Sequence, residues 1–419
     1  MATILTIFSG SVGHYKGFTR FVAANKISQD FIYASNDLKA GQNVSKFYGL
    51  PCQPAYMNNE FLMNIPLLKK IELKLENTLF LRRKFYLDKL LEQANPDVVI
   101  LDNFNFTDAL IIHALGHYHK LRVILYQTRL STFLNASDNY GGVYKGQFAM
   151  LSARGILSRQ KRKRRMESIL MPGFNDEFRI KRLINENGIK KIKLNTYRFG
   201  PPSLTYLPEL IFSNPTMSDN HSTNQYFMGL GVLSVDRKQA HRRIRNILVS
   251  IGSREFIFDF TDRYVKTIDY LAQVFHDFIF FVPQSFEARV IGRNVHYYTW
   301  DTYKICLEGA DIHITHGGIN SIKDSLRYGL PMMICPMDWK SDQIHNALLF
   351  WKLGMADIWN VKVDTRAEVQ FKLESIVKSL KRESIIEFME KAAKENPEDK
   401  IQSQFSELIE DRQWQVEKW

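Results

Sequence analysis

Short apolar runs alternate with amphipathic segments through the first part of the chain. Runs rich in β-branched and aromatic residues predict buried strands, and apolar residues spaced three and four apart predict helices. The expected strands are 3–8, 30–34, 98–101 and 122–126, and the expected helices are 18–25, 66–94 and 108–119. Residues 9–14 are expected to form a loop. The alternation predicts an α/β fold with a parallel, doubly wound sheet.

A second series of the same kind begins near residue 246. Its expected strands are 247–251, 278–282, 310–315 and 331–335, its expected helices are 261–275 and 320–328, and residues 404–419 also have helical character. A chain of 419 residues is longer than one hydrophobic core usually supports. We therefore expect two domains, at 1–230 and 246–400, with a linker at 231–245 and a terminal helix within 401–419.

Composition narrows the class of protein. Hydrophobic residues at 45% and charged residues at 24% are typical of a globular protein rather than a disordered one. The three cysteines are too scattered for a disulfide framework or a zinc site, which favours a reducing compartment. Residues 1–8 carry no basic leader, and no window has the eighteen or more apolar residues of a membrane span. We expect a cytoplasmic protein.

The net charge of +12 is partly concentrated in one run, Lys161-Arg162-Lys163-Arg164-Arg165. Such a run is usually a solvated loop or helix face, and the alternative is peripheral attraction to anionic lipid at the inner face of the membrane. It lacks the interleaved aromatic residues of a base-stacking surface, so nucleic acid is not an expected partner.

The clearest chemical motif is His316-Gly317-Gly318-Ile319-Asn320-Ser321, which follows an expected strand and opens an expected helix. The first N–H groups of a helix lack intrahelical partners and lie at the positive end of the helix dipole. The glycines allow close approach of a pyrophosphate, and the polar side chains add donors. Taken alone, a strand followed by two glycines is also common in α/β proteins without any phosphate ligand.

The residues that follow this motif carry a family resemblance. In order they are Asp324, Gly329-Leu330-Pro331, Pro336, Asp342-Gln343 and Asn346-Ala347. This order resembles the nucleotide-sugar signature of the UDP-glycosyltransferase superfamily, family 1 with a GT-B fold, of the bacterial macrolide or carotenoid type. Val249-Ser250-Ile251-Gly252-Ser253 and Tyr226-Phe227-Met228-Gly229 are similar to two further family motifs. The resemblance implies two Rossmann-like domains facing across a cleft, with the last helix packed back on the first domain.

The resemblance also assigns roles in binding the donor. Ser253, His316, Gly317, Gly318, Asn320 and Ser321 would bind the phosphates, Asp324 the ribose, Trp300 and Tyr303 the base, and Trp339, Asp342 and Gln343 the sugar. The chain departs from the family pattern in three places. Asp324 replaces a longer glutamate, Trp300 is not followed by the usual Pro-Gln, and 337–341 is longer than in many relatives.

Two residues in the first half are candidates for catalysis. His14 follows the first expected strand in a Gly-His sequence that resembles the general base of the superfamily, and a neutral imidazole can accept a hydroxyl proton near pH 7. Asp102 directly follows another expected strand and could orient the ring of His14. The alternatives are a surface or capping histidine and an aspartate N-cap, a role for which Asp108 competes.

These observations predict an inverting glycosyltransferase that moves a hexose from a UDP- or dTDP-sugar to a hydroxyl of a small apolar or amphipathic acceptor. Phe104 and Phe106, just after Asp102, are the candidate acceptor-pocket residues. No cofactor or metal is expected to be required, because helix dipoles can stabilise the leaving diphosphate and no Asp-x-Asp motif occurs. The alternatives are a glycolipid glycosyltransferase at a membrane, a catalytically silent nucleotide-sugar-binding partner protein, and a nucleotide-sugar epimerase.

Overall fold

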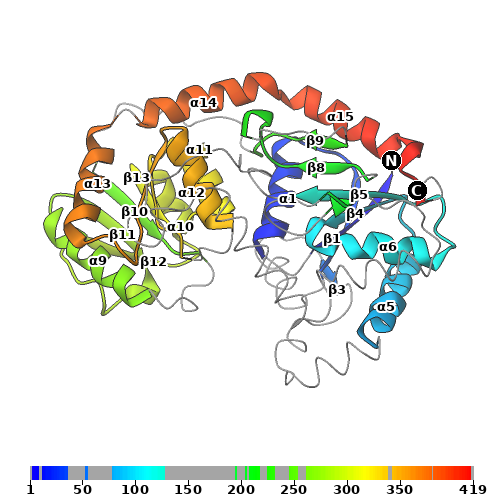
Figure 1. Ribbon diagram of the computed structural model, residues 1–419, viewed down its shortest axis with the longest axis horizontal. Helices are drawn as coiled ribbons and strands as arrows, with labels where there is room; N and C mark the ends of the chain where they lie inside the picture. The colour runs from blue at the N-terminus through cyan, green and yellow to red at the C-terminus, as the bar shows by residue number, and fades with distance from the viewer. Residues whose placement is uncertain are drawn as a thin grey trace. The chain divides into compact units, whose positions relative to one another are not determined.

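A computed structural model of the chain describes residues 2–8, 12–35, 52–54, 78–127, 194–195, 203–204, 207–217, 224–231, 245–252, 261–337, 342–379 and 381–416. The chain divides into two compact units. Unit 1 comprises Met1–Phe133, Leu157–Gly231 and Asn396–Trp419, and unit 2 comprises Leu134–Ile156 and Val232–Glu395. Each unit contains a parallel sheet with helices on both faces (Figure 1).

In the described part of unit 1 the sheet has the strand order β3-β2-β1-β4-β5-β8-β9, with every neighbouring pair parallel. Its strands are β1 (Thr3–Phe8), β2 (Asp30–Ser35), β3 (Cys52–Pro54), β4 (Val98–Asp102), β5 (Arg122–Gln127), β8 (Glu209–Ile211) and β9 (Gln225–Phe227). A separate antiparallel pair is formed by β6 (Leu194–Asn195) and β7 (Ser203–Leu204). The helices are α1 (Val12–Ala24), α5 (Thr78–Ala94), α6 (Phe106–Leu115) and α15 (Glu398–Glu410), with 3-10 turns η1 (Asn103–Asn105), η3 (Pro215–Met217) and η6 (Arg412–Trp414).

The two faces of this sheet are buried by different helices. Alternate residues of the central strands, such as Val99 and Leu101, pack with α5 and α6 on one face. The residues between them, such as Val98 and Ile100, pack with α1 and α15 on the other face. The ring of Phe405 on α15 lies 5.6 Å from that of Phe21 on α1. The sheet is thus covered on both sides, as a parallel sheet requires.

The first helix begins earlier than the sequence predicts. We expected residues 9–14 to be a loop and a helix at 18–25, but α1 runs from Val12 to Ala24. The glycines at positions 13 and 17 suggest a loop, because glycine disfavours helix interiors. Burial of Tyr15, Phe18 and Phe21 at helical spacing outweighs that local preference. His14 therefore lies in the first turn of a helix rather than in a loop.

Unit 2 has the strand order β12-β11-β10-β13-β14-β15 in its described residues, again parallel throughout. The strands are β10 (Asn246–Ser250), β11 (Ile279–Pro283), β12 (Val295–Tyr298), β13 (Ile312–Thr315), β14 (Met332–Ile334) and β15 (Ala356–Ile358). The described helices are α9 (Thr261–Val274), α10 (Tyr303–Gly309), α11 (Ile319–Arg327), α12 (Asp342–Lys352), α13 (Arg366–Lys378) and α14 (Lys381–Glu395), together with the 3-10 turn η5 (Gln284–Phe286).

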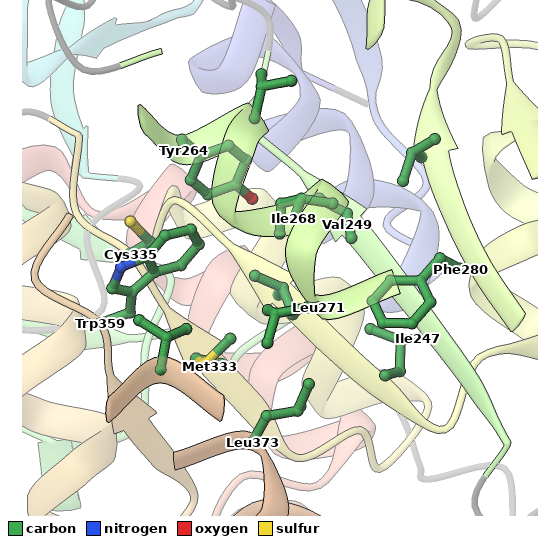
Figure 2. Close-up of a cluster of buried hydrophobic side chains, with 14 of the residues drawn as sticks. Ile247, Val249, Tyr264, Ile268, Leu271, Phe280, Met333, Cys335, Trp359 and Leu373 are labelled. Atoms are coloured by element: carbon green, nitrogen blue, oxygen red, sulfur yellow. The ribbon is translucent and has the colours of Figure 1, made fainter. Parts of the chain in front are cut away.

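The core of unit 2 lies between the sheet and the helices α9 and α13 (Figure 2). Tyr264 of α9 stacks on the buried Trp359, with the ring centroids 4.8 Å apart. Figure 1 shows α11 and α12 on the opposite side of this sheet from α9 and α13. This doubly wound arrangement leaves the turn between β13 and α11 at the carboxyl end of the sheet, where open α/β sheets bind ligands. In the part of the chain that is described, none of the helices could cross a bilayer.

Candidate active site

His14 and Asp102 are joined by a short hydrogen bond. The imidazole Nδ1 of His14 lies 2.6 Å from Oδ2 of Asp102. The topology explains this contact, because β1 and β4 are parallel neighbours, and α1 starts just beyond the carboxyl end of β1. The Asp102 side chain is 2% exposed and that of His14 is 20% exposed. The buried partner is therefore the carboxylate, and the imidazole is the group that reaches solvent.

The alternative role for Asp102, as the cap of the following helix, is not the arrangement observed. Helix α6 starts at Phe106 after the turn η1, and its N-cap residue is Asn105. Asp108, which competed for that role, forms a buried ion pair with Arg83 of α5, with Nε and Oδ1 2.5 Å apart. Neither aspartate is thus the N-cap residue of α6.

A third residue of this group was not predicted from the sequence. The hydroxyl of Tyr126, on β5, donates to Oδ2 of Asp102 at 3.3 Å. Residues 102 and 126 are register partners in the β4–β5 pair, so the two side chains lie on the same face of the sheet. Burial raises the pKa of Tyr126 well above its ordinary value, and the nearby Asp102 carboxylate adds to the effect. Tyr126 is therefore a neutral phenol that donates a hydrogen bond to the carboxylate.

In unit 2 the predicted phosphate motif forms the turn between β13 and α11. The N-cap residue of α11 is Gly318, which has no side chain with which to cap the helix. The first intrahelical bond runs from the N–H of Ile322 to the carbonyl of Gly318 at 3.1 Å. The N–H groups of residues 319–321 precede that bond, so they have no carbonyl acceptor within the helix. This is the arrangement that suits an anionic ligand.

Glycines surround the ring of His316 in this turn. A β-carbon added at Gly252 would lie 2.6 Å from Cε1 of His316, and one added at Gly318 would lie 2.4 Å from Nε2. Gly317 has φ +84°, and a β-carbon there would lie 2.8 Å from Ile334. The ring thus packs between the backbone of two glycines, which joins the end of β10 to the end of β13. Ser253, the next predicted phosphate ligand, lies outside the described residues.

His316 is neutral at physiological pH. Burial lowers the pKa of His316 to about 4, because the enclosed ring cannot hydrate a positive charge. Its Nδ1 is buried and has no hydrogen-bond partner among the described residues. A neutral imidazole carries one N–H donor and one acceptor nitrogen. The ring can therefore offer a ligand a single hydrogen bond and no net charge.

A second histidine, His313 on β13, was missed by the sequence analysis. Its Nε2 lies 2.8 Å from Oγ of Ser250, and its Nδ1 lies 2.7 Å from Oγ of Ser325. The Ser325 hydroxyl donates to the carbonyl of Ser321 at 3.0 Å. Ser325 must then accept from Nδ1–H of His313, whose Nε2 accepts from Ser250. The chain of hydrogen bonds links β10, β13 and α11 behind the phosphate turn.

Burial also keeps this second ring uncharged. It lowers the pKa of His313 to about 3, an effect that the Asp324 carboxylate opposes. The sequence around it, Asp311-Ile312-His313-Ile314-Thr315, has the pattern of a buried strand. The local sequence does not reveal the hydrogen-bond partners of His313, because Ser250 is distant in sequence and Ser325 lies on the next helix.

The residues predicted to bind the nucleoside lie near one another. Trp300 is 55% exposed, and its ring centroid is 5.7 Å from that of the buried Tyr303. The hydroxyl of Tyr303 is 3.4 Å from Oδ2 of Asp324, whose side chain is also buried. An exposed indole, a phenol and a carboxylate thus follow one another from Trp300 to Asp324 on α11.

The predicted sugar-binding residues are only partly described. The side-chain carbonyl of Gln343 accepts a hydrogen bond from the N–H of Met337 at 2.9 Å, and Asn346 donates to the carbonyl of Gly317 at 2.9 Å. Both bonds hold the segments around the turn. The side chains of Asp342, Phe104 and Phe106 lie outside the described residues, as do Trp339 and the basic run at 161–165. Within the described ranges no group of three His, Cys, Asp or Glu residues could hold a metal ion.

Comparison with known proteins identifies the fold of the chain. Residues 233–405 match the family model described as the glycosyltransferase family 28 C-terminal domain. No curated protein matches the chain by sequence. Solved structures do match along nearly the whole chain, which shows that it has the GT-B fold predicted from the sequence.

Three of these structures illustrate the likeness. The glycotransferase of kitacinnamycin has a TM-score of 0.65 at 16% identity, over 97% of this chain and 98% of that one. Glycosyltransferase VinC in complex with DTDP has a TM-score of 0.60 at 14% identity, over 97% and 98%. The spinosyn rhamnosyltransferase SpnG complexed with spinosyn aglycone has a TM-score of 0.61 at 13% identity, over 97% and 100%.

Proposed function

We propose, from the GT-B fold of the chain and the glycosyltransferase family match of residues 233–405, that this protein is an inverting glycosyltransferase. In the proposed reaction an acceptor oxygen displaces a nucleoside diphosphate from the anomeric carbon of a nucleotide sugar in one step. The acceptor oxygen loses a proton, and the departing diphosphate gains negative charge. The described residues of the two units supply groups suited to each of these two changes.

The observation that carries the proposal is the bond of 2.6 Å between Nδ1 of His14 and Oδ2 of Asp102. With Nδ1–H donated to the carboxylate, Nε2 of a neutral ring is left with a lone pair. That lone pair can take the acceptor proton as the C–O bond forms, and the buried carboxylate stabilises the imidazolium that results.

The turn between β13 and α11 is suited to the leaving diphosphate. The N–H groups of residues 319–321, which have no acceptor within the helix, can donate to phosphate oxygens, and the dipole of the helix favours the negative charge of those oxygens. The neutral ring of His316 can add one donor without the cost of burying a cation. These donors are fixed before the reaction begins, so they can stabilise charge as it develops, and the proposed mechanism needs no metal.

The relatives indicate the class of substrates. VinC was solved with DTDP and SpnG with spinosyn aglycone. By analogy we propose a dTDP-sugar as the donor, ahead of a UDP-sugar, and a hydroxyl of an apolar natural product as the acceptor. The exposed Trp300 beside Tyr303 could stack on the pyrimidine base, and Asp324 could bind the ribose through a hydrogen bond.

Ligand-induced stabilisation tests this proposal without knowledge of the acceptor. A nucleoside diphosphate at about a hundred times its dissociation constant should raise the free energy of unfolding by about 2.7 kcal/mol. We expect dTDP to stabilise the protein more than UDP, and both more than ADP. Slow hydrolysis of the matching sugar nucleotide should then be lost in His14→Ala. If no diphosphate stabilises the protein, and no nucleotide sugar is hydrolysed or transferred, the proposal is wrong.

A further inference from the structure

One carboxylate oxygen receives two hydrogen bonds in the first unit. Oδ2 of Asp102 lies 2.6 Å from Nδ1 of His14 and 3.3 Å from the hydroxyl of Tyr126. We propose that Tyr126 is a positioning residue that limits the basicity of His14 by competing with it for this oxygen. The inference deepens the proposed function, because it concerns the group assigned there as general base.

The surroundings of Tyr126 favour a fixed role rather than an incidental contact. Its side chain is fully buried, and its ring packs against Phe18, Phe212 and Phe8 with centroids 5.2, 5.7 and 6.1 Å away. Three aromatic rings from β1, α1 and the residue after β8 thus hold the phenol in place. Because the hydroxyl is buried, it cannot donate to solvent. It donates to Asp102 instead.

The effect on His14 follows from the electrostatics of a shared acceptor. A donor to a carboxylate stabilises the anion and lowers its affinity for a further proton or cation. With the phenol bonded, Asp102 stabilises a protonated His14 less than it would alone. Removal of the phenol hydroxyl should therefore make the carboxylate a stronger partner and His14 a stronger base. The hydrogen bond from Tyr126 thus weakens the interaction between Asp102 and a protonated His14.

Two other phenols lie in the aromatic cluster around Tyr126. The phenols of Tyr15 and Tyr33 belong to it, with their rings 4.3 and 6.0 Å from that of Phe8. Burial raises the pKa of Tyr33 to about 12, so it is uncharged in the pH range of interest. Asp102 is the carboxylate that affects Tyr126. The competition for Oδ2 is therefore the interaction to test.

NMR titration of the histidine rings provides that test. The protein has 11 histidines, and the resonance of His14 can be assigned by its absence from His14→Gln. In Tyr126→Phe we expect the titration midpoint of His14 to rise by about half a pH unit, from loss of one hydrogen bond of ordinary strength. The matched control is Tyr33→Phe, which removes a hydroxyl from the same aromatic cluster without touching Asp102. An unchanged or lowered midpoint in Tyr126→Phe overturns the proposal.

The same substitution made in the Asp102→Asn variant separates an effect through Asp102 from an effect by another route. If Tyr126 acts through the charge of Asp102, then Tyr126→Phe should shift His14 little or not at all in Asp102→Asn. An equal shift in both backgrounds would show that the hydroxyl acts by another route, and the proposal would fail. The readout needs no substrate, so an absence of glycosyl transfer would refute the proposed function and leave this result standing. Thermal unfolding of each variant reports whether the fold is retained.

Discussion

The imidazole of His316 lies against the α-carbon of Gly252, so closely that an added β-carbon would be 2.6 Å from its Cε1. The two residues follow neighbouring strands, since β10 and β13 are parallel partners. The contact fixes the position of the ring beside the start of α11. It also makes the glycine after β10 part of the proposed phosphate site, although it offers no side chain.

Gly252→Ala should therefore destabilise the protein and weaken nucleotide binding. Gly252 has φ +76°, and alanine in that region costs about 1 kcal/mol before any clash. Displacement of His316 should bring the total loss in unfolding free energy to at least about 2 kcal/mol. Denaturant unfolding and dTDP titration measure the two effects. Gly354→Ala is the control, because Gly354 has φ +72° and open space around it. Equal losses in the two variants would contradict the packing argument.

Asp102→Asn should lower kcat by about a hundredfold or more, with the fold retained. The amide is similar in size to the carboxylate but cannot stabilise an imidazolium by charge. Initial rates of sugar transfer or sugar-nucleotide hydrolysis provide the measurement. The chain offers a matched control in Asp88→Asn, since Asp88 forms another His–Asp pair, 2.9 Å from His117, on the exposed surface of unit 1. A similar loss of rate in both variants would rule out the catalytic role of Asp102.

The free energy of unfolding should fall as the pH is lowered from 7 to 5. The pKa values of His313 and His316 are lowered from 6.5 to about 3 and about 4 in the folded protein. Between these values and 6.5 the unfolded chain binds more protons, so acid favours unfolding. Each histidine should contribute a loss of about 2 kcal/mol at pH 5. Chemical denaturation at the two pH values measures the difference.

The variant His313→Gln should reduce that pH-dependent loss by about 2 kcal/mol, because one of the two titrations is removed. Its stability at pH 7 should also be lower, since Ser250 and Ser325 lose a bridging ring. His276→Gln is the control, because the side chain of His276 is 79% exposed. If His313→Gln loses as much stability between pH 7 and 5 as the unaltered protein, the account of His313 is wrong.

Trp300→Ala should weaken dTDP binding by about tenfold without changing the stability of the unliganded protein. Stacking of a base on an aromatic ring is worth about 1–3 kcal/mol, and a side chain that is 55% exposed contributes little to the core. Isothermal titration with dTDP and thermal unfolding give the two readouts. Phe371→Ala on α13, where the ring is 72% exposed, should change neither. Unaltered affinity in Trp300→Ala would remove Trp300 from the site.

Eight strands of the two sheets could be predicted because a buried parallel strand leaves a local signal, whereas β3, β8, β9, β12 and β15 were not predicted. The expected strand 3–8 coincides with β1, and the other predicted strands differ by one or two residues from those observed. Their residues face helices on both sides, so each strand is a continuous apolar run. The start of α1 was predicted too late, because its glycines suggested a loop and only tertiary packing of Tyr15 selects the helix.

Pairings within the candidate site were less accessible from sequence. His14 and Asp102 were found because each follows a recognisable strand and the family motif marks the first. Tyr126 and His313 were missed because each lies inside an apolar strand, and their hydrogen-bond partners depend on the register of β4–β5 and β10–β13.

Outside the candidate site, a local sequence signal was overlooked at Thr365. This residue forms a capping box with Glu368 at the start of α13.

Helix α15 has a consequence for the order in which the protein acquires its structure. Ile401, Phe405, Leu408 and Ile409 complete the core face that α1 covers in unit 1, yet they are synthesised only after the whole of unit 2. During synthesis on the ribosome the aromatic side chains of α1 therefore lack their packing partners on α15, while unit 2 can already fold. A chain cut before residue 396 would keep the proposed phosphate turn but leave Phe21 and Phe31 without Phe405. Such fragments should aggregate through the first unit rather than the second.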